Sequence, residues 1–313
     1  MPLTVDHAPH LDYGLIHLAD FHMNEIDDTF LIGGDLPVRR MGFGAMRLTG
    51  PGVWGPPEDE PNARAVLRRA VEQGVQFIDT ADVYGPGDNE RLIREALHPY
   101  APGLVIGTKG GMVRSGPATR ANPGMSMNGS EAHIRAAVEG SLRLLGVERI
   151  DLYQLHRVDP ATPIEETMRV FRTLRDEGKI RHVGLSEVSV DQIKRARAVV
   201  DIATVQNVYS LAARQHGDVL AFCERNGIGF IPFWPLHGGA LAQSREMASI
   251  AAARRATPAQ VSLAWLLRKS PNIILIPGTS SIAHLEENLA ARSVALSEDD
   301  MATLDALSIP DPR

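Results

Sequence analysis

Short runs of apolar residues alternate along this chain with longer segments in which apolar residues recur every three or four positions. The short runs predict buried strands, and the longer segments predict amphipathic helices. The strand-like runs lie at 42–45, 77–79, 104–109, 150–156, 182–186, 204–206, 228–233 and 273–276. The helix-like segments lie at 63–72, 90–97, 130–145, 164–177, 190–199, 217–226, 258–268 and 282–291. This alternation predicts an α/β protein whose parallel sheet closes into a single (β/α)8 TIM barrel.

A β-hairpin is expected before the first of these units, at residues 29–38. Its turn falls on Gly33-Gly34 or Gly34-Asp35, because such pairs suit the tight turns that join two antiparallel strands. The barrel is therefore predicted to carry an N-terminal β-hairpin in addition to its eight repeated units.

The two ends of the chain depart from the repeated pattern. Residues 298–307 predict an added C-terminal helix with Ser297 as its N-cap. Residues 1–28 show no periodicity, and we interpret them as a solvated extension rather than a metal site. The four histidines that raise the metal hypothesis are irregularly spaced: His7, His10, His17 and His22. No interior linker interrupts residues 29–313, which we interpret as one domain.

Polar side chains follow three of the predicted strands. Asp79 ends one strand, Tyr84 lies in the loop after it, and Lys109 and His156 end the next two strands. Because barrels keep their active sites at the carboxyl ends of the strands, these side chains are expected to lie together. Each alone is typical of an ordinary strand end, but the four in this order favour a catalytic site.

The chemistry of this set is specific. Asp79 favours the ammonium form of Lys109, and an ammonium lowers the pKa of a nearby phenol from its usual value of about 10. The set therefore predicts that Tyr84 donates a proton near neutral pH, while the imidazole of His156 orients a carbonyl oxygen.

The sequence resembles the aldo-keto reductases from about residue 30 to residue 308. The resemblance rests on the order and spacing of the segments 41–44, 77–81 with 84–85, 108–109, 151–156, 184–186, 205–207 with 209–210, and 276–279. It implies a TIM barrel that transfers hydride from NADPH to a carbonyl substrate. The family's catalytic tetrad maps onto Asp79, Tyr84, Lys109 and His156, with Tyr84 as the general acid.

The resemblance also implies where the nicotinamide lies. Ser186 and Gln206 are expected to hydrogen-bond its carboxamide, a task that suits groups that both donate and accept. Glu187 stands where the family usually has Asn, and it either accepts from the amide or points away. Phe233 replaces the usual Tyr and still offers an aromatic face for stacking.

Residues that come after the last two strands are expected to bind the other end of the dinucleotide. Trp234 and Leu236 belong to the segment that covers the pyrophosphate in the family, although Trp234 also has an alternative interpretation as a core residue. A helix start with hydroxyl groups predicts an anion site after the eighth strand. The residues that the resemblance assigns to the adenosine phosphate and the adenine are Thr279, Ser280, Ser281, Glu287 and Asn288.

The preferred dinucleotide is expected to be NADPH, by a modest margin. Family members that prefer NADPH commonly carry an arginine and a lysine where this chain has His284 and Gly278. His284 is retained as a contact, and the hydroxyls of the neighbouring helix start are expected to receive the 2′-phosphate.

The substrate end is expected to involve two long loops. Residues 50–57 resemble the same loop in bacterial family members that reduce pyridoxal, and Trp54 there is either a wall for a flat substrate or part of a rigid surface loop. The second loop, 110–129, carries three methionines and is either a lid or a solvated connection. Arg114 and Arg120 in this loop are candidates to meet an acidic substrate group.

Composition narrows the function further. A formal net charge of -6 argues against a surface that binds nucleic acid or an anionic membrane. The single cysteine, Cys223, excludes an intramolecular disulfide and suits the reducing cytoplasm. No apolar run reaches the roughly 18 residues of a membrane helix, and no secretory signal is evident at the N-terminus. We expect a cytoplasmic protein that acts on a small carbonyl compound.

Two other functional classes remain open. One is a non-catalytic dinucleotide-binding regulatory subunit, because some family members partner membrane channels. The other is a metal-dependent barrel hydrolase, but the strand ends offer one clear histidine and few acids, so we expect no metal. A Rossmann nucleotide site is not an alternative, because no Gly-x-Gly-x-x-Gly motif follows a strand.

Overall fold

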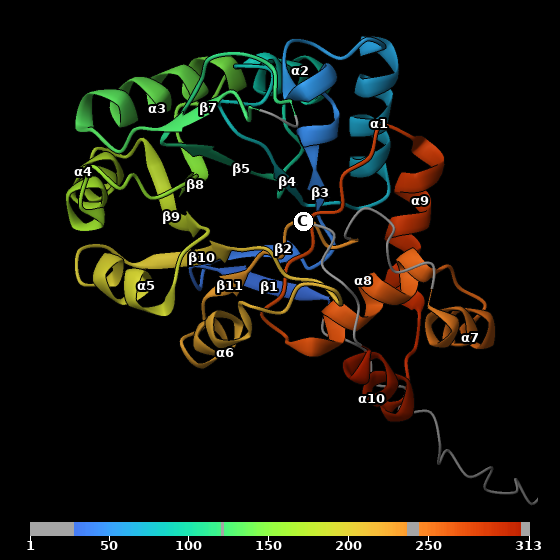
Figure 1. Ribbon diagram of the computed structural model, residues 1–313. Helices are drawn as coiled ribbons and strands as arrows, with labels where there is room; N and C mark the ends of the chain where they lie inside the picture. The colour runs from blue at the N-terminus through green and yellow to red at the C-terminus, as the bar shows by residue number, and fades with distance from the viewer. Residues whose placement is uncertain (1–27, 120–121, 237–243, 308–313) are drawn as a thin grey trace, which may run out of the picture.

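The computed structural model describes residues 28–119, 122–236 and 244–307. A curved parallel sheet of seven strands forms its centre, with neighbours in the order β11-β10-β9-β8-β5-β4-β3 (Figure 1). The strands are β3 (Phe43–Gly44), β4 (Phe77–Asp79), β5 (Val105–Gly110), β8 (Ile150–Leu155), β9 (Ile180–Ser186), β10 (Ile202–Gln206) and β11 (Gly229–Phe230). Each coincides with a predicted run to within a few residues.

The eighth predicted strand closes the barrel through isolated bridges rather than a continuous ladder. Ile273 pairs with Phe230 on one side, and Leu275 pairs with Met41 on the other. The amide of Leu275 donates to the carbonyl of Arg40 at 2.7 Å. The guanidinium of Arg40 is buried and donates to carbonyl oxygens at the end of the preceding helix and at the start of this segment. The predicted (β/α)8 barrel is thereby confirmed.

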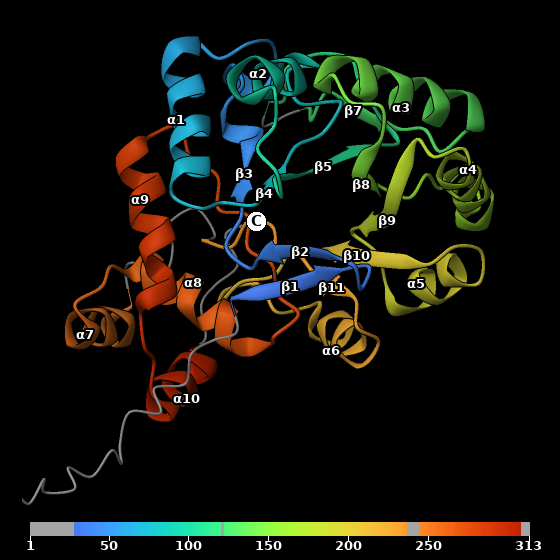
Figure 2. The ribbon, with the colours of Figure 1, turned by 180° about the vertical axis from the view of Figure 1, so that it is seen from behind.

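Helices surround the strands in Figures 1 and 2. The eight predicted between strands are α1 (Glu60–Glu72), α2 (Asp88–Leu97), α3 (Glu131–Leu145), α4 (Ile164–Asp176), α5 (Val190–Arg197), α6 (Gly217–Arg225), α8 (Pro258–Lys269) and α9 (Ile282–Ala290). The added C-terminal helix, α10 (Glu298–Ala306), is also present, and Ser297 caps it as expected. No helix in the described part of the chain combines the length and apolar content needed to span a membrane.

Besides three short 3-10 helices, three elements in the described part of the chain were not predicted. Helix α7 (Arg245–Arg254) buries only Met247, Ile250 and Ala251, so its apolar side was too small to stand out in an alanine-rich segment. The loop expected at 110–129 contains the antiparallel strands β6 (Met112–Arg114) and β7 (Met125–Met127). The loop is therefore a structured hairpin over the barrel rather than a simple connection.

The N-terminal hairpin closes the amino end of the barrel. Strands β1 (Thr29–Ile32) and β2 (Leu36–Arg39) pair antiparallel, as predicted, and Figure 2 shows them in the foreground beside β11. Apolar residues of the hairpin share a buried cluster with Phe77 and Val105, the first residues of their strands. Only the carboxyl end of the barrel is therefore left to receive a ligand. The first 27 residues and their histidines lie outside the described residues.

Candidate active site

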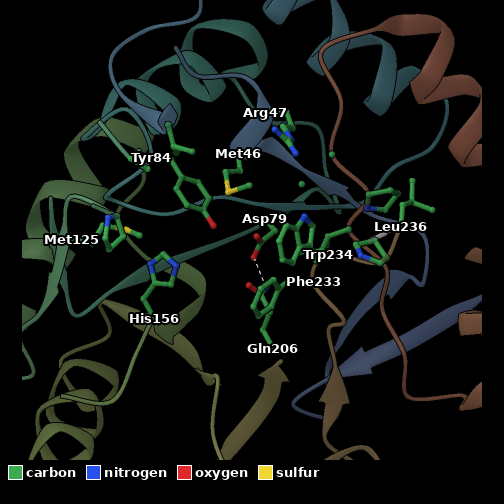
Figure 3. A pocket seen from close by; sticks show the side chains of 18 of the residues that line it. Met46, Arg47, Asp79, Tyr84, Met125, His156, Gln206, Phe233, Trp234 and Leu236 are labelled. Carbon is green, nitrogen blue, oxygen red and sulfur yellow. Dashed lines mark hydrogen bonds between the residues drawn. The ribbon is translucent and has the colours of Figure 1, made fainter. Parts of the chain in front are cut away.

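A cavity of about 910 Å³ opens at the carboxyl ends of the strands. Figure 3 shows the side chains of Tyr84, His156 and Phe233 pointing into it from three different strand ends. The residues predicted from the sequence that line it are Asp79, Tyr84, Arg114, His156, Gln206, Phe233, Trp234, Leu236 and Glu287. Side chains separated by more than 200 positions in the chain therefore meet in one space.

Lys109 and Asp79 form a buried ion pair at the base of the cavity. The Lys109 ammonium donates to Asp79 Oδ2 at 2.7 Å and to the carbonyl oxygen of Thr80 at 2.8 Å. The other Asp79 oxygen accepts from the side-chain amide of Gln206 at 2.9 Å. Burial alone would lower the pKa of Lys109, but the charge of Asp79 and the Tyr84 phenol raise it overall. Lys109 is therefore a fixed cation.

Tyr84 lies next to this cation. The Lys109 nitrogen is 5.1 Å from the centre of the Tyr84 ring. Burial raises the pKa of Tyr84 more than the charge of Lys109 lowers it, and Asp79 raises it further. The prediction of a lowered pKa is therefore wrong in its net sign, although Lys109 acts in the expected direction. Tyr84 keeps its proton across the neutral range and is a ready proton donor.

His156 faces Tyr84 across a short gap. The two ring centres are 5.8 Å apart and the ring planes are nearly perpendicular. Burial, followed by the charges of Lys109, Arg157 and Arg114, lowers the pKa of His156 well below its usual value. The imidazole is therefore neutral. Its Nδ1 is buried without a hydrogen-bond partner among the residues that the structure describes.

Two further acids lie behind the strand that carries Lys109. Glu90 is fully buried on α2 and accepts a hydrogen bond of 2.6 Å from the hydroxyl of Thr108. Burial raises the pKa of Glu90, and burial together with Glu90 raises the pKa of Asp82 well above its usual value. One carboxyl oxygen of each lacks a partner in the described residues. Both groups therefore favour the protonated form, so they leave Lys109 paired with Asp79.

The two residues expected to bind a carboxamide are both partnered within the protein. Ser186 Oγ accepts from Arg157 Nη1 at 2.9 Å, and Gln206 donates to Asp79. Glu187 follows the second of the two alternatives considered for it and points away from the cavity, where its carboxylate accepts from the amide of Val208 at 2.7 Å. Glu187 thus fixes the chain after β10 rather than facing a ligand.

The aromatic residues after β11 belong to the cavity. Phe233 lines it, and Trp234 also lines it with 44% of its surface exposed. The interpretation of Trp234 as a core residue is therefore wrong. Leu236 lines the cavity as well. The neighbouring His237 and the glycines after it lie outside the described residues.

The segment after the eighth strand combines a tightly packed glycine with hydroxyl groups at the start of a helix. Gly278 lines the cavity, and a Cβ on it would lie 2.6 Å from the carbonyl oxygen of Gly44. A lysine at this position would therefore require the two backbones to separate. Ser281 caps α9, and Thr279 Oγ1 accepts from the amide of Ser281 at 3.0 Å. The exposed start of α9 therefore carries hydroxyl groups and lies close to the backbone of Gly278, which has no side chain. This arrangement favours the binding of an anion.

The residues expected at the adenosine end lie on α9, with α8 beside them. Glu287 lines the cavity and accepts a hydrogen bond of 2.6 Å from Thr257. His284 is exposed in the first turn of α9, and Asn288 is buried on the same helix. The structure thus places Thr279, Ser280, Ser281 and His284 around one helix start, with Glu287 at the edge of the cavity.

Trp54 lies apart from the site. It is 39% exposed, and the cavity is lined by its neighbour Val53 instead. The surrounding loop is held by Arg114, which donates to the carbonyl oxygens of Gly52 and Val53. The amide of Ala118 also donates to Gly52, at 2.9 Å. This loop and the β6–β7 hairpin are therefore tied together over the substrate end.

Two charged cavity residues were missed by sequence reasoning. Arg157 follows His156 directly, and Arg47 lies in the loop after β3; both line the cavity. The available signal was their position, because each follows a strand end by at most a few residues. Arg120, considered beside Arg114 as an anion contact, lies outside the described residues. No group of three or more histidine, cysteine or acidic residues in the described ranges is arranged to hold a metal ion.

Comparison with known proteins identifies the family of this chain. The model of the aldo/keto reductase family matches residues 40–309. An uncharacterized oxidoreductase of Schizosaccharomyces pombe is 46% identical over 273 residues, covering 87% of both chains. Pyridoxine 4-dehydrogenase of Escherichia coli is 43% identical over 287 residues, covering 90% of this chain and 98% of the relative. An aldo-keto reductase of Klebsiella pneumoniae, solved in complex with NADPH, has a TM-score of 0.75 and 30% identity over 91% of this chain and 96% of its own.

Proposed function

Since this chain belongs to the aldo/keto reductase family and is an NADP-dependent oxidoreductase, we propose that it reduces an aldehyde or ketone with Tyr84 as its general acid. The observation that carries this proposal is the meeting of the Tyr84 phenol and the His156 imidazole at one cavity. Behind them lies a buried ammonium that is itself paired with Asp79. This arrangement suits a carbonyl oxygen that gains negative charge during the reaction.

Each side chain then has a distinct role. The neutral imidazole of His156 donates a hydrogen bond that fixes the carbonyl oxygen beside the Tyr84 hydroxyl. Tyr84 gives its proton to that oxygen as the carbon is reduced, and solvent later restores the proton. Lys109 stabilises the phenolate that Tyr84 becomes, and Asp79 keeps Lys109 charged and in place.

NADPH supplies the hydride when it is bound, and the residues present suit it. Phe233 offers an aromatic face, and Ser186 and Gln206 stand at the neighbouring strand ends. For their side chains to hold a carboxamide, the bonds that they make to Arg157 and Asp79 must be shared or exchanged. The polar helix start at Ser281 is suited to the adenosine phosphate.

We further propose that the substrate pair is pyridoxal and pyridoxine or a related aromatic aldehyde. The E. coli pyridoxine 4-dehydrogenase supports this through 43% identity over almost its full length. The cavity supports it through apolar walls that include Phe233, Met112 and Met125, since a flat ring gains from burial against such side chains. Trp54, for which such a wall was one of two alternatives, is not among the residues that line the cavity.

The experiment is a panel of aldehydes including pyridoxal, with NADPH consumption followed by absorbance for the wild type and for Tyr84→Phe. We expect turnover by the wild type and a loss of at least about 100-fold in the variant, because a general acid is removed. NADPH affinity, measured by fluorescence quenching, should stay within about twofold. Undiminished turnover in Tyr84→Phe would refute the assignment. A wild type that binds NADPH but reduces no aldehyde would instead favour the non-catalytic subunit.

A further inference from the structure

Within the described residues, Arg157 is held at one of its three guanidinium nitrogens. Nη1 donates to the carbonyl oxygen of His156 at 2.6 Å and to Ser186 Oγ at 2.9 Å. Nε and Nη2 make no hydrogen bond to any residue that the structure describes, although Arg157 lines the cavity. One edge of the guanidinium is thus anchored, and the Nε–Nη2 edge remains available. That edge can bind two oxygen atoms at once.

Arg157 lies at the end of the cavity that holds His156 and Phe233. Its guanidinium carbon lies 5.6 Å from the centre of the Phe233 ring. Its charge also acts on both His156 and Tyr84. Arg157 therefore stands beside the two groups that would contact a carbonyl oxygen, and next to the aromatic wall.

Positive charge is in excess around this end of the cavity. Lys109, Arg114 and Arg157 all act on His156. Asp79 neutralises Lys109, but neither arginine has an ion pair with a carboxylate in the described part of the chain. Glu187 acts on Arg157 from further away, and its own carboxylate is engaged with the amide of Val208. Burial lowers the pKa of both arginines, so their charge is poorly solvated.

We infer that the substrate of this enzyme carries an anionic oxygen in addition to its carbonyl group, and that the free edge of Arg157 binds that oxygen. The inference rests on the proposed carbonyl reduction and names the class of substrate for it. A carboxylate or an ionised hydroxyl on an aromatic aldehyde supplies the required group. The anion takes no part in the hydride and proton transfers, so it selects and orients the substrate without altering the reaction.

Pyridoxal is compatible with this class. Its ring hydroxyl is adjacent to the aldehyde carbon, and the electron-withdrawing ring makes that hydroxyl acidic. An arginine beside the residues that hold the aldehyde oxygen is therefore placed to contact such a hydroxylate. An aliphatic or neutral aldehyde would leave the free edge of Arg157 without a partner.

Matched pairs of aldehydes test the inference. The first pair is 3-carboxybenzaldehyde and its methyl ester, and the second is 2-hydroxy-5-nitrobenzaldehyde and its methyl ether. Each pair differs chiefly in the anionic oxygen, and the two pairs separate a carboxylate from an ionised hydroxyl. Both kcat/KM and the affinity measured by calorimetry with oxidised cofactor present are compared for wild type, Arg157→Met and Arg157→Lys.

The wild type should prefer the anionic member of at least one pair by about tenfold or more, as expected for a charged hydrogen bond. Arg157→Met should remove this preference while kcat/KM for the neutral member falls by less than about threefold. Arg157→Lys should restore part of the preference, because it keeps the charge. Arg47→Met is the matched control, since it removes a cavity arginine beside Gly278, and its anionic-to-neutral ratio should be unchanged.

Equal losses for both members of a pair in Arg157→Met would overturn the inference, because they indicate a structural role through His156 and Ser186. The inference would also be overturned if the wild type showed no preference for either anionic aldehyde, in turnover or in binding. The binding measurement separates this inference from the proposed function. Preferential binding of the anion without turnover of any aldehyde would contradict the reductase proposal and still support the site at Arg157.

Discussion

The Lys109 ammonium lies 2.7 Å from Asp79 Oδ2, and both side chains are buried where the strand ends meet. Gln206 donates to the second oxygen of the same carboxylate, so Asp79 is held from two sides. The pair does two things at once. It keeps a positive charge next to the Tyr84 phenol, and it prevents that charge from being buried alone, which would be costly.

Removing one member of this pair should therefore destabilise the protein as well as inactivate it. Lys109→Met leaves the Asp79 carboxylate buried and unpaired, and we expect its free energy of unfolding to fall by about 3–5 kcal/mol. Urea unfolding measures this loss. The double variant Lys109→Met with Asp79→Asn should recover much of the stability and none of the activity. Equal stability of Lys109→Met and the wild type would show that the carboxylate is not isolated in the variant.

The rate of carbonyl reduction should be nearly independent of pH around neutrality. The raised pKa of Tyr84 means that the acid loses its proton, and activity falls, only above about pH 10. The lowered pKa of His156 means that the imidazole becomes charged, and activity falls, only well below about pH 6.5. A profile of kcat/KM for an uncharged aldehyde between these limits should therefore be flat. An inflection between pH 6.5 and 8 would contradict the burial that keeps both groups neutral.

Glu90 should make the protein less stable as pH rises. Burial raises the pKa of Glu90 in the folded protein above its value in the unfolded chain. At a pH between these two pKa values, the native state keeps a proton that the unfolded chain has lost. The free energy of unfolding falls with rising pH in that window, by about 1.4 kcal/mol for each unit of raised pKa. Glu90→Gln removes this penalty and keeps an acceptor for Thr108. Its stability relative to the wild type should rise between pH 4 and pH 7, as measured by thermal unfolding.

Glu177 is the matched control for that measurement. Hydrogen bonding to Arg135 lowers the pKa of Glu177, so its stabilising contribution is present above the unfolded pKa and is lost as pH falls. Glu177→Gln should therefore lose stability at pH 7 and approach the wild type below pH 4. The two variants should show opposite trends. A parallel response would mean that neither trend comes from the carboxyl group replaced.

His284→Arg should strengthen discrimination between the two dinucleotides. His284 is exposed at the start of α9, beside the hydroxyls expected to receive the 2′-phosphate. A fixed positive charge there should tighten NADPH by about three- to fivefold, the range of an exposed ion pair, and leave NADH nearly unchanged. Fluorescence titration of both cofactors measures the difference. Equal tightening of both would place the new charge at the pyrophosphate instead.

Much of the fold was predictable because strand and helix periods alternate cleanly along this chain. Helix α7 was missed since its buried side is formed by few and small residues, with Met247 and Ile250 as the larger ones. The eighth strand was found from its apolar run at Ile273–Ile276, and its pairing by isolated bridges depends on the curvature of the whole sheet. Such curvature follows from packing and is not visible in a local pattern.

The site residues that could be predicted are reactive side chains at or just after the end of a strand. Asp79, Tyr84 and His156 met in one cavity as expected, because barrel topology alone brings those ends together. The net pKa of Tyr84 was not predictable, because its sign depends on how burial compares with the charge of Lys109. The free edge of Arg157 was also hidden, since the direction of a long side chain is decided by partners such as Ser186.

The ties between the 50–57 loop and the β6–β7 hairpin bear on how this enzyme could acquire new substrates. Arg114 and Ala118 bind the backbone of Gly52, and the amide of Gly85, next to Tyr84, donates to Val53. A loop transplanted alone from a relative would lose contacts to the other loop and disturb the turn that carries the acid. Successful exchange therefore requires both segments to be inherited as one block. Engineers and natural recombination face the same restriction.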